Sequence, residues 1–236
     1  MERIIDENLE KLKTRLIKMC SLVDEQVDMA IRAVNEENPE LAKMVIDRDA
    51  KVDKYDLKID KICLKLFALS QPVAMDLRLI MSSVTINSNL ERIGDIAVNI
   101  AENYLRLKQK PDFFNRTKFQ EMANLLKEML RNSIDSFIQQ NADLAEKVIQ
   151  TDKLLDNLNS ENYQILISIM KENPANIDAA VEFLGMSRQM ERIGDHTTNI
   201  AEDVYFIVKA NLIKHKYEKY IFAEQQDEAD DSEEIV

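Results

Sequence analysis

Apolar residues recur along this chain at the spacing of long amphipathic helices. In one stretch, Leu41, Val45, Val52 and Ile59 follow one another at intervals of four or seven residues, which is the period of a helix with one buried face. Prolines mark the points where one such pattern stops and the next begins. The pattern predicts helices at about residues 4–36, 39–69, 72–109, 114–140, 142–171 and 174–211.

The boundary residues and the composition agree with this prediction. An asparagine that can cap a helix precedes a proline at Asn38-Pro39 and at Asn173-Pro174, and Pro72 opens another predicted helix. Proline is tolerated at the first position of a helix, where its missing N–H has no intrahelical partner. The chain has only three glycines and four prolines, so few turns interrupt the helices. We therefore expect an all-α protein.

An internal duplication organises these helices. Residues 91–102 read ERIGDIAVNIAE and residues 191–202 read ERIGDHTTNIAE, which are identical at nine of twelve positions. The preceding helices also correspond, because 41–46 resembles 144–149. Three helices with short links must run antiparallel, so the fold expected is two tandem three-helix bundles of six long antiparallel helices. The predicted units are a first repeat at 1–111, a second repeat at 112–212 and a C-terminal tail at 213–236.

The charge of the chain argues against one class of partner. The formal net charge is −12, whereas proteins that bind nucleic acids generally carry basic patches that neutralise phosphates. We therefore expect no nucleic-acid partner. Seven acidic residues lie within the last thirteen positions, which predicts a basic and then acidic, partly disordered tail.

The remaining composition points to a cytoplasmic protein. Cys20 and Cys63 lack a second thiol at the spacing of a metal site or redox motif, so we expect buried free thiols in a reducing compartment. The N-terminus has no uninterrupted apolar segment, and no stretch reaches the roughly 20 apolar residues that span a bilayer. Any association with a membrane would then depend on partners.

The duplicated motif places oxygen-bearing side chains on one face of a helix. Residues four positions apart differ by about 40° around the axis, so the acidic and amide residues of each copy form a narrow stripe. These residues are Glu91, Asp95, Asn99 and Glu102 in the first copy and Glu191, Asp195, Asn199 and Glu202 in the second. Packing an apolar face does not require the same acids in both copies, so their repetition indicates shared chemistry.

A second acidic stripe is predicted on the preceding helix of each repeat. Its residues are Asp49, Asp53, Asp56 and Asp60 in the first copy and Asp152 and Asp156 in the second. Like charges that face each other need a counter-charge, and bound cations supply it. Carboxylate and amide oxygens without thiolates suit Mg, Mn, Fe(III) or Ca, and also Zn through carboxylates. The alternative is a pair of solvated polar helix faces.

Two glycines and one histidine lie within the repeated motifs and bear on whether the acidic stripes hold a metal. Gly94 and Gly194 lie beside the stripes inside helices, where glycine is about 1 kcal/mol less favourable than alanine, which indicates a close approach by a neighbouring helix or a metal. His196 points about 100° away from Asp195 and is expected to be a hydrogen-bonded structural residue. A ferritin-like di-iron site would need Glu-x-x-His, but Gly94 and Gly194 occupy that position.

No enzyme motif accompanies the acidic stripes. The sequence has no glycine-rich phosphate loop, no Cys/His finger and no nucleophile with a plausible histidine base. We therefore expect a protein that is not an enzyme. Two alternatives stay open, which are a carboxylate-bridged metal enzyme on a helical bundle and a purely structural helical scaffold.

The whole chain resembles the PhoU family of regulators of bacterial and archaeal phosphate uptake. The resemblance rests on the six helices in two repeats, on Glu-x-x-x-Asp-x-x-x-Asn at 91–99 and 191–199, and on Asp76-Leu77-Arg78 ahead of the first motif. It implies a homodimer and multinuclear metal clusters of Fe, Zn, Mn or Mg. The ligands it implies are Glu91, Asp95, Asn99, Glu191, Asp195 and Asn199, with Asp49, Asp53, Asp152 and Asp156 from the facing helices.

The resemblance also implies a function. Members of this family act as cytoplasmic negative regulators when phosphate is plentiful. The partners implied are the ATPase subunit of the phosphate ABC transporter and a sensor histidine kinase, between which the protein would serve as an adaptor.

Overall fold

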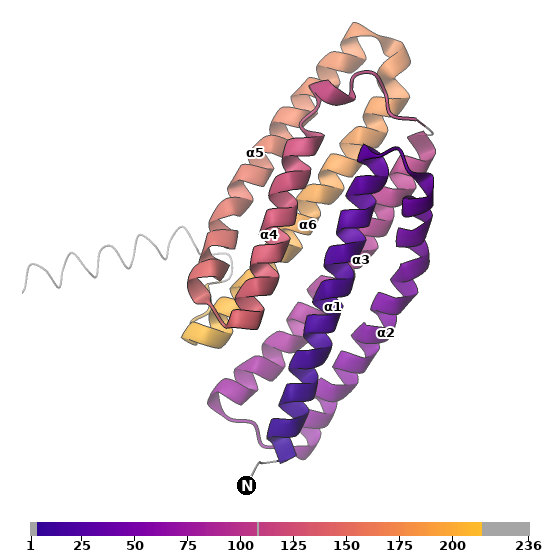
Figure 1. Cartoon of the computed structure of the whole chain (residues 1–236). Coiled ribbons are helices and arrows are strands. Elements are labelled where there is room, and N and C mark those ends of the chain that lie inside the picture. The colour runs from indigo at the N-terminus through magenta and orange to yellow at the C-terminus, as the bar shows by residue number, and fades with distance from the viewer. Residues whose placement is uncertain (1–3, 108, 214–236) are drawn as a thin grey trace, which may run out of the picture.

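The computed structural model describes residues 4–107 and 109–213 and shows six long helices and no strand in that part of the chain (Figure 1). The helices are α1 (Ile4–Asn35), α2 (Pro39–Leu69), α3 (Ala74–Leu107), α4 (Phe119–Gln139), α5 (Ala142–Glu172) and α6 (Ile177–Lys209). Two short 3₁₀ turns are η1 (Phe114–Arg116) and η2 (Pro174–Asn176). The predicted all-α fold with six helices is confirmed.

Asparagine caps define two of the helix starts. The Asn38 side chain accepts hydrogen bonds from the backbone N–H groups of Glu40 and Leu41, and Pro39 occupies the first helical position. In the same way Asn141 accepts a hydrogen bond from the Leu144 N–H at the start of α5. Each cap satisfies donors that have no partner within the helix, so these boundaries follow from local chemistry.

Three predicted boundaries are wrong at the start of a helix. The third helix begins at Ala74 and not at 72, because Ala74 has a φ of 46° and this left-handed conformation interrupts the helix. The last helix begins at Ile177, because the Asn173 side chain accepts a hydrogen bond from the Ala175 N–H and caps a 3₁₀ turn, which the Asn176 N–H closes on the Asn173 backbone oxygen. Short local hydrogen bonds thus replace a predicted helical turn.

The fourth helix begins at Phe119 and not at 114, because the preceding aromatic residues pack together. Phe114 lies in η1, and its ring centroid is 5.6 Å from those of both Phe119 and Phe183. Phe113 makes an edge contact with Phe183 at 5.9 Å. Such tilted and edge contacts are favourable arrangements of aromatic rings, and they join the start of the second bundle to α6.

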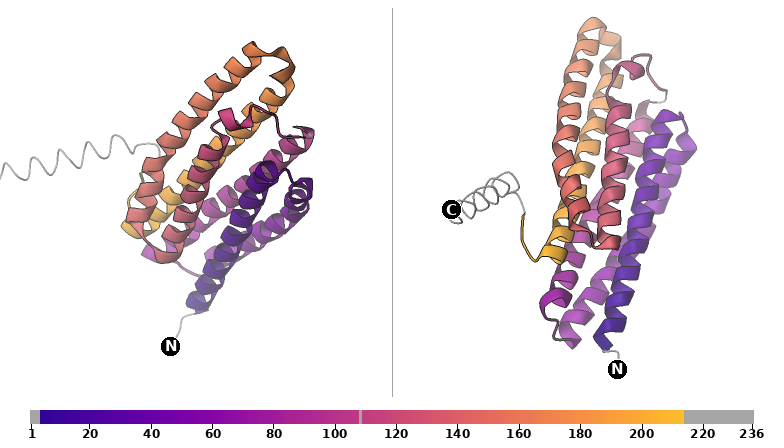
Figure 2. Two further views of the ribbon diagram at one scale, coloured as in Figure 1. Left: turned by 45° about the horizontal axis from the view of Figure 1, so that its top comes forward. Right: turned by 60° about the vertical axis from the view of Figure 1, so that its left-hand side comes forward.

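The helices form two three-helix bundles that lie side by side along their length (Figures 1 and 2). In the first, α1 packs against α2 and α3, and in the second, α4 packs against α5 and α6. The most extensive contact between helices is that of α3 with α6. Thr85 pairs with Asp203 and Arg106 with Glu182, so α3 and α6 run antiparallel through the centre of the molecule.

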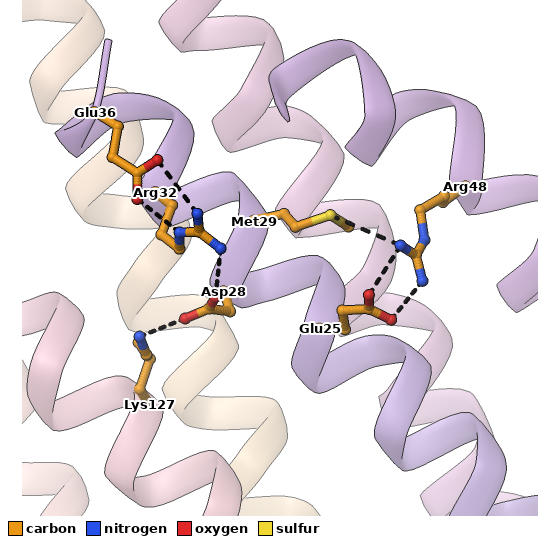
Figure 3. A network of polar contacts seen from close by, with 7 residues as sticks. All are labelled: Glu25, Asp28, Met29, Arg32, Glu36, Arg48 and Lys127. Atoms are coloured by element: carbon orange, nitrogen blue, oxygen red, sulfur yellow. Dashed lines mark hydrogen bonds and ion pairs between the residues drawn. The ribbon is translucent and has the colours of Figure 1, made fainter. Parts of the chain in front are cut away.

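Polar side chains of α1 contact residues of α2 and of α4 (Figure 3). Arg48 of α2 donates to the two carboxylate oxygens of Glu25, and Lys127 of α4 pairs with Asp28. Ion pairs near the surface generally contribute little to stability. We therefore regard this network as setting the register of α1 between α2 and α4, whereas burial of the apolar faces provides most of the stability.

The buried interior agrees with the predicted apolar pattern. Val45, Val52 and Ile59 of α2 are all buried, and the predicted burial of Cys20 and Cys63 as free thiols is confirmed. Within the described ranges, no helix is both long and apolar enough to cross a bilayer. The tail predicted from residue 213 lies outside the described residues except at its first position.

Candidate metal centre

The acidic stripes of α2 and α3 face each other in the structure and form what we call the first acidic cluster. Its members are Asp49, Asp53 and Asp56 of α2 and Glu91 and Asp95 of α3. Burial and the negative charge of Asp95 raise the pKa of Glu91. Burial also raises the pKa of Asp49, and the negative charges of Asp53 and Asp95 raise it further. The two predicted stripes of the first repeat therefore meet.

The second repeat places its acids in the same way and forms the second acidic cluster. Its members are Asp152 and Asp156 of α5 and Glu191 and Asp195 of α6. Burial, followed by the charges of Asp156 and Asp195, raises the pKa of Asp152 to about 6. Burial and the charge of Asp195 raise that of Glu191. Carboxylates of like charge thus face one another in both bundles, and the guanidinium groups of Arg92 in the first and of Arg188 and Arg192 in the second offset their repulsion only in part.

The repeated glycines lie where the helices that carry these acids pack against each other. A Cβ atom on Gly194 would fall 2.5 Å from Leu155 Cδ2 and 3.4 Å from Asp152 Oδ1. On Gly94 it would fall 3.4 Å from Val52 Cγ1 and 3.5 Å from Asp49 Oδ1. The predicted close approach of a neighbouring helix is confirmed at Gly194, whereas the distances at Gly94 are those of ordinary van der Waals contact.

The motif asparagines lie farther along the helices. Asn99 is half-buried on α3, and the Asn199 amide of α6 donates to Asn89 Oδ1 of α3 at 3.4 Å. The predicted structural role of His196 is supported by a 2.9 Å hydrogen bond between its Nδ1 and the same Asn89 oxygen. Asn199 and His196 thus join the seam between α3 and α6.

Sequence reasoning missed two buried amides that contact the first acidic cluster. Gln26 of α1 is 1% exposed, and its Nε2 donates to Asp49 Oδ1 at 3.1 Å. Asn87 of α3 is fully buried, and its Nδ2 donates to Asp56 Oδ1 at 2.7 Å and to Asp60 Oδ1 at 3.1 Å. The sequence feature that could have revealed them is an uncharged polar residue at a position where the helical pattern predicts a buried apolar one.

The residues of the clusters fit a hard cation by their chemistry. Carboxylates dominate both donor sets, and oxygen ligands are those preferred by Mg²⁺, Mn²⁺ and Ca²⁺. Gln26 Oε1, buried beside the first cluster, has no hydrogen-bond partner among the described residues. In the same part of the chain no group of three or more His, Cys, Asp or Glu side chains is arranged so that it could hold a metal ion. The acids are therefore gathered on facing helices without converging on a single point.

Comparisons with known proteins identify the family. A profile of the PhoU domain matches residues 16–104 and 119–204, once in each bundle. The phosphate-specific transport system accessory protein PhoU homolog of Aquifex aeolicus is 39% identical over 213 residues, which cover 90% of this chain and 96% of that protein. The homolog of Clostridium acetobutylicum is 31% identical and covers 89% and 97%.

Solved structures agree with the sequence relatives. The crystal structure of PhoU from Pseudomonas aeruginosa superimposes with a TM-score of 0.84 at 32% identity, covering 87% of this chain and 99% of that one. The phosphate transport system regulatory protein PhoU from Streptococcus pneumoniae gives a TM-score of 0.81 at 26% identity. The two bundles and the repeated motif are thus found together in proteins of one family. The chain belongs to the PhoU family.

Proposed function

We propose that this protein is an accessory regulator of a phosphate-specific transport system. The observation that carries the proposal is the match over about nine-tenths of the chain to relatives described as accessory proteins of that system. In detail, we propose a cytoplasmic negative regulator that is homodimeric and not an enzyme. It would act as an adaptor between the transporter's ATPase subunit and a sensor histidine kinase when phosphate is abundant.

The regulatory proposal is tested in cells that lack the gene. With abundant phosphate, we expect phosphate uptake and a phosphate-starvation reporter both to rise, and the wild-type gene to restore them. Unchanged uptake and reporter output in the deletion strain would contradict negative regulation by this protein.

Exposed apolar side chains near the junction of α2 and α3 support a role in binding other proteins. Leu64 is 68% exposed, Leu69 is 74% exposed and Val73 is 64% exposed. Large apolar side chains exposed close together in the sequence offer a surface that a partner protein could cover. We expect Leu69→Glu with Val73→Glu to weaken retention of the purified ATPase subunit. Leu154→Glu, which changes a leucine 56% exposed on α5, is the matched control, and equal retention by both variants would argue against this surface.

We further propose that the two acidic clusters bind cations. Asp49, Asp53, Glu91 and Asp95 would hold one group of ions, and the corresponding acids of the second cluster would hold another. Fe, Zn, Mn or Mg would supply positive charge between helices that otherwise repel each other. Asn99 and Asn199 are the remaining candidate ligands.

In this proposal the carboxylates of each cluster link neighbouring helices through the bound ion. They tie α2 to α3 and α5 to α6 through the ion, so that ion binding is coupled to the stability of each bundle. Mass spectrometry of the purified protein should detect bound metal, and Asp95→Asn with Asp195→Asn should reduce the amount. Equal metal content in wild type and variant would contradict the assignment.

A further inference from the structure

Gln26 occupies an unusual position for a polar residue. It lies on the inner face of α1, and its side chain is 1% exposed. Its Nε2 donates to the backbone oxygen of Val45 at 3.3 Å and to Asp49 Oδ1 at 3.1 Å. A third helix, α1, therefore contacts the first acidic cluster, although the repeated motif and its facing stripe lie on α3 and α2.

The surrounding acceptors fix the orientation of this amide. If the amide were turned over, Gln26 Oε1 would face the Val45 carbonyl and the Asp49 carboxylate, both of which are acceptors. The nitrogen must therefore face these two groups, which leaves Oε1 on the side of the amide that adjoins Gly94. A Cβ atom built on Gly94 would lie 3.6 Å from Gln26 Oε1 and 3.5 Å from Asp49 Oδ1, so both oxygens lie beside the glycine backbone of α3.

In that orientation Gln26 Oε1 is a buried acceptor without a hydrogen-bond donor among the described residues. Leaving a buried polar atom unsatisfied is unfavourable. A cation held by the neighbouring carboxylates, or a water molecule of its hydration shell, would satisfy this oxygen. The amide is neutral, so it adds an oxygen without adding to the repulsion among the carboxylates.

The second repeat lacks this feature. The same 103 residues separate Asn38 from Asn141 and Asp49 from Asp152, and the residue 103 positions after Gln26 is Met129. Met129 is buried on α4, but a thioether is only a weak acceptor and cannot donate to a carboxylate. The two acidic clusters therefore differ in a residue that neither copy of the motif contains.

We propose that Gln26 belongs to the ion site of the first acidic cluster, where its amide nitrogen orients Asp49 and its Oε1 faces the bound cation or its water. The second cluster binds its cation without an amide from α4. This inference rests on the cation binding proposed above, and it makes the two ion sites of the chain unequal in composition.

The experiment measures Mn²⁺ binding by isothermal titration calorimetry in a full-length background that keeps only one cluster. Asp152→Asn with Asp195→Asn leaves the first cluster intact. In that background, Gln26→Met, which installs the residue of the second repeat, should weaken Mn²⁺ binding about tenfold, equivalent to about 1.4 kcal/mol. In the opposite background, Asp49→Asn with Asp95→Asn, the same substitution should leave Mn²⁺ affinity unchanged.

Folding and ion binding are separated by a second measurement. The melting temperature of each variant is recorded in chelator and with saturating Mn²⁺, because a residue that only packs α1 would lower both values equally. We expect Gln26→Met to reduce the increase that Mn²⁺ produces in the first-cluster background. Gln26→Leu, which also removes both polar atoms, should behave in the same way and serves if the methionine variant does not fold.

Two different failures can be told apart. If the first-cluster background binds Mn²⁺, loses it on Asp95→Asn and keeps its affinity within about twofold on Gln26→Met, the inference is overturned while cation binding stands. If the intact first cluster binds no Mn²⁺, both the inference and the proposed cation site fail.

Discussion

Replacing Asp152 with asparagine should stabilise the metal-free protein at neutral pH. Asp152 is half-buried on α5 beside the other acids of the second acidic cluster. Burial, followed by the charges of Asp156 and Asp195, raises its pKa from 3.8 to about 6. The folded state therefore disfavours the charged form that is present at neutral pH, and asparagine keeps the shape of the side chain without that charge.

The pKa sets the expected size of the effect. A rise from 3.8 to about 6 corresponds to roughly 3 kcal/mol against the charged form in the folded state. Because the side chain is partly exposed and water screens the repulsion, we reduce this to about 1.5 kcal/mol. The Asp152→Asn variant should then have a free energy of unfolding about 1.5 kcal/mol above that of wild type in chelator at about pH 8.

The sign of the pH dependence follows from proton binding. The folded protein binds the Asp152 proton more tightly than the unfolded chain does, so this group lowers the stability of wild type as pH rises from about 4 to about 6. Above that range the loss is complete. The difference between the variant and wild type should therefore shrink when the pH is lowered from about 8 to about 5.5.

Urea denaturation followed by circular dichroism at these two pH values provides the assay. Glu128→Gln is the control, because it removes a charge from the exposed pair with Lys147 and should change the free energy of unfolding by less than about 0.5 kcal/mol. Lower stability of Asp152→Asn at about pH 8 in chelator would refute the reasoning, and so would a gain that does not depend on pH. Added Mn²⁺ should stabilise wild type more than the variant.

Two further stability predictions follow from the packing. Gly194→Ala should lower the free energy of unfolding by about 1–2 kcal/mol, because its Cβ would fall 2.5 Å from the buried Leu155 Cδ2. Gly94→Ala, whose Cβ would have ordinary contact distances, should be neutral or stabilising by up to about 1 kcal/mol. Urea denaturation of both variants tests this, and a less stable Gly94→Ala than Gly194→Ala would contradict it. Thr85→Ala should lower the free energy of unfolding by about 1–2 kcal/mol in the same assay, because the Thr85 hydroxyl donates at 2.5 Å to the buried Asp203 carboxylate. Thr85→Ser keeps the hydroxyl and should retain most of the stability. Equal losses in both variants would argue against a stabilising role of the hydrogen bond.

The acidic clusters were largely predictable because a helix has a fixed period. Once residues 74–107 form a helix, Glu91 and Asp95 must share a face. The duplication then singled out this face, since the same acids recur at 191 and 195. The pairing of α2 with α3 was also predictable, because a short link forces neighbouring helices to run antiparallel.

The contribution of Gln26 was not predictable in the same way. A single glutamine on α1 gives no indication of which residue of α2 it will meet, because that depends on the rotation and register of α1 in the bundle. The contact with Asp49 joins residues 23 positions apart. The contact of Asn199 was unpredictable for a similar reason. Its amide contacts Asn89 of the other repeat, and the sequence of either repeat alone does not show how α3 packs on α6.

The sequence by itself determined the helices, their duplication and the faces that carry the acids, because these depend on periodicity, capping and interactions between near neighbours. The starts of three helices departed from the prediction where side-chain caps, a left-handed residue or aromatic packing competed with the helix. Only the tertiary structure decided how closely the helices approach at Gly94 and Gly194, which amides enter the first acidic cluster, and how far burial raises the pKa of Asp152. These properties arise from surfaces brought together over long separations in the chain, where the packing of whole helices sets distances that no local pattern records.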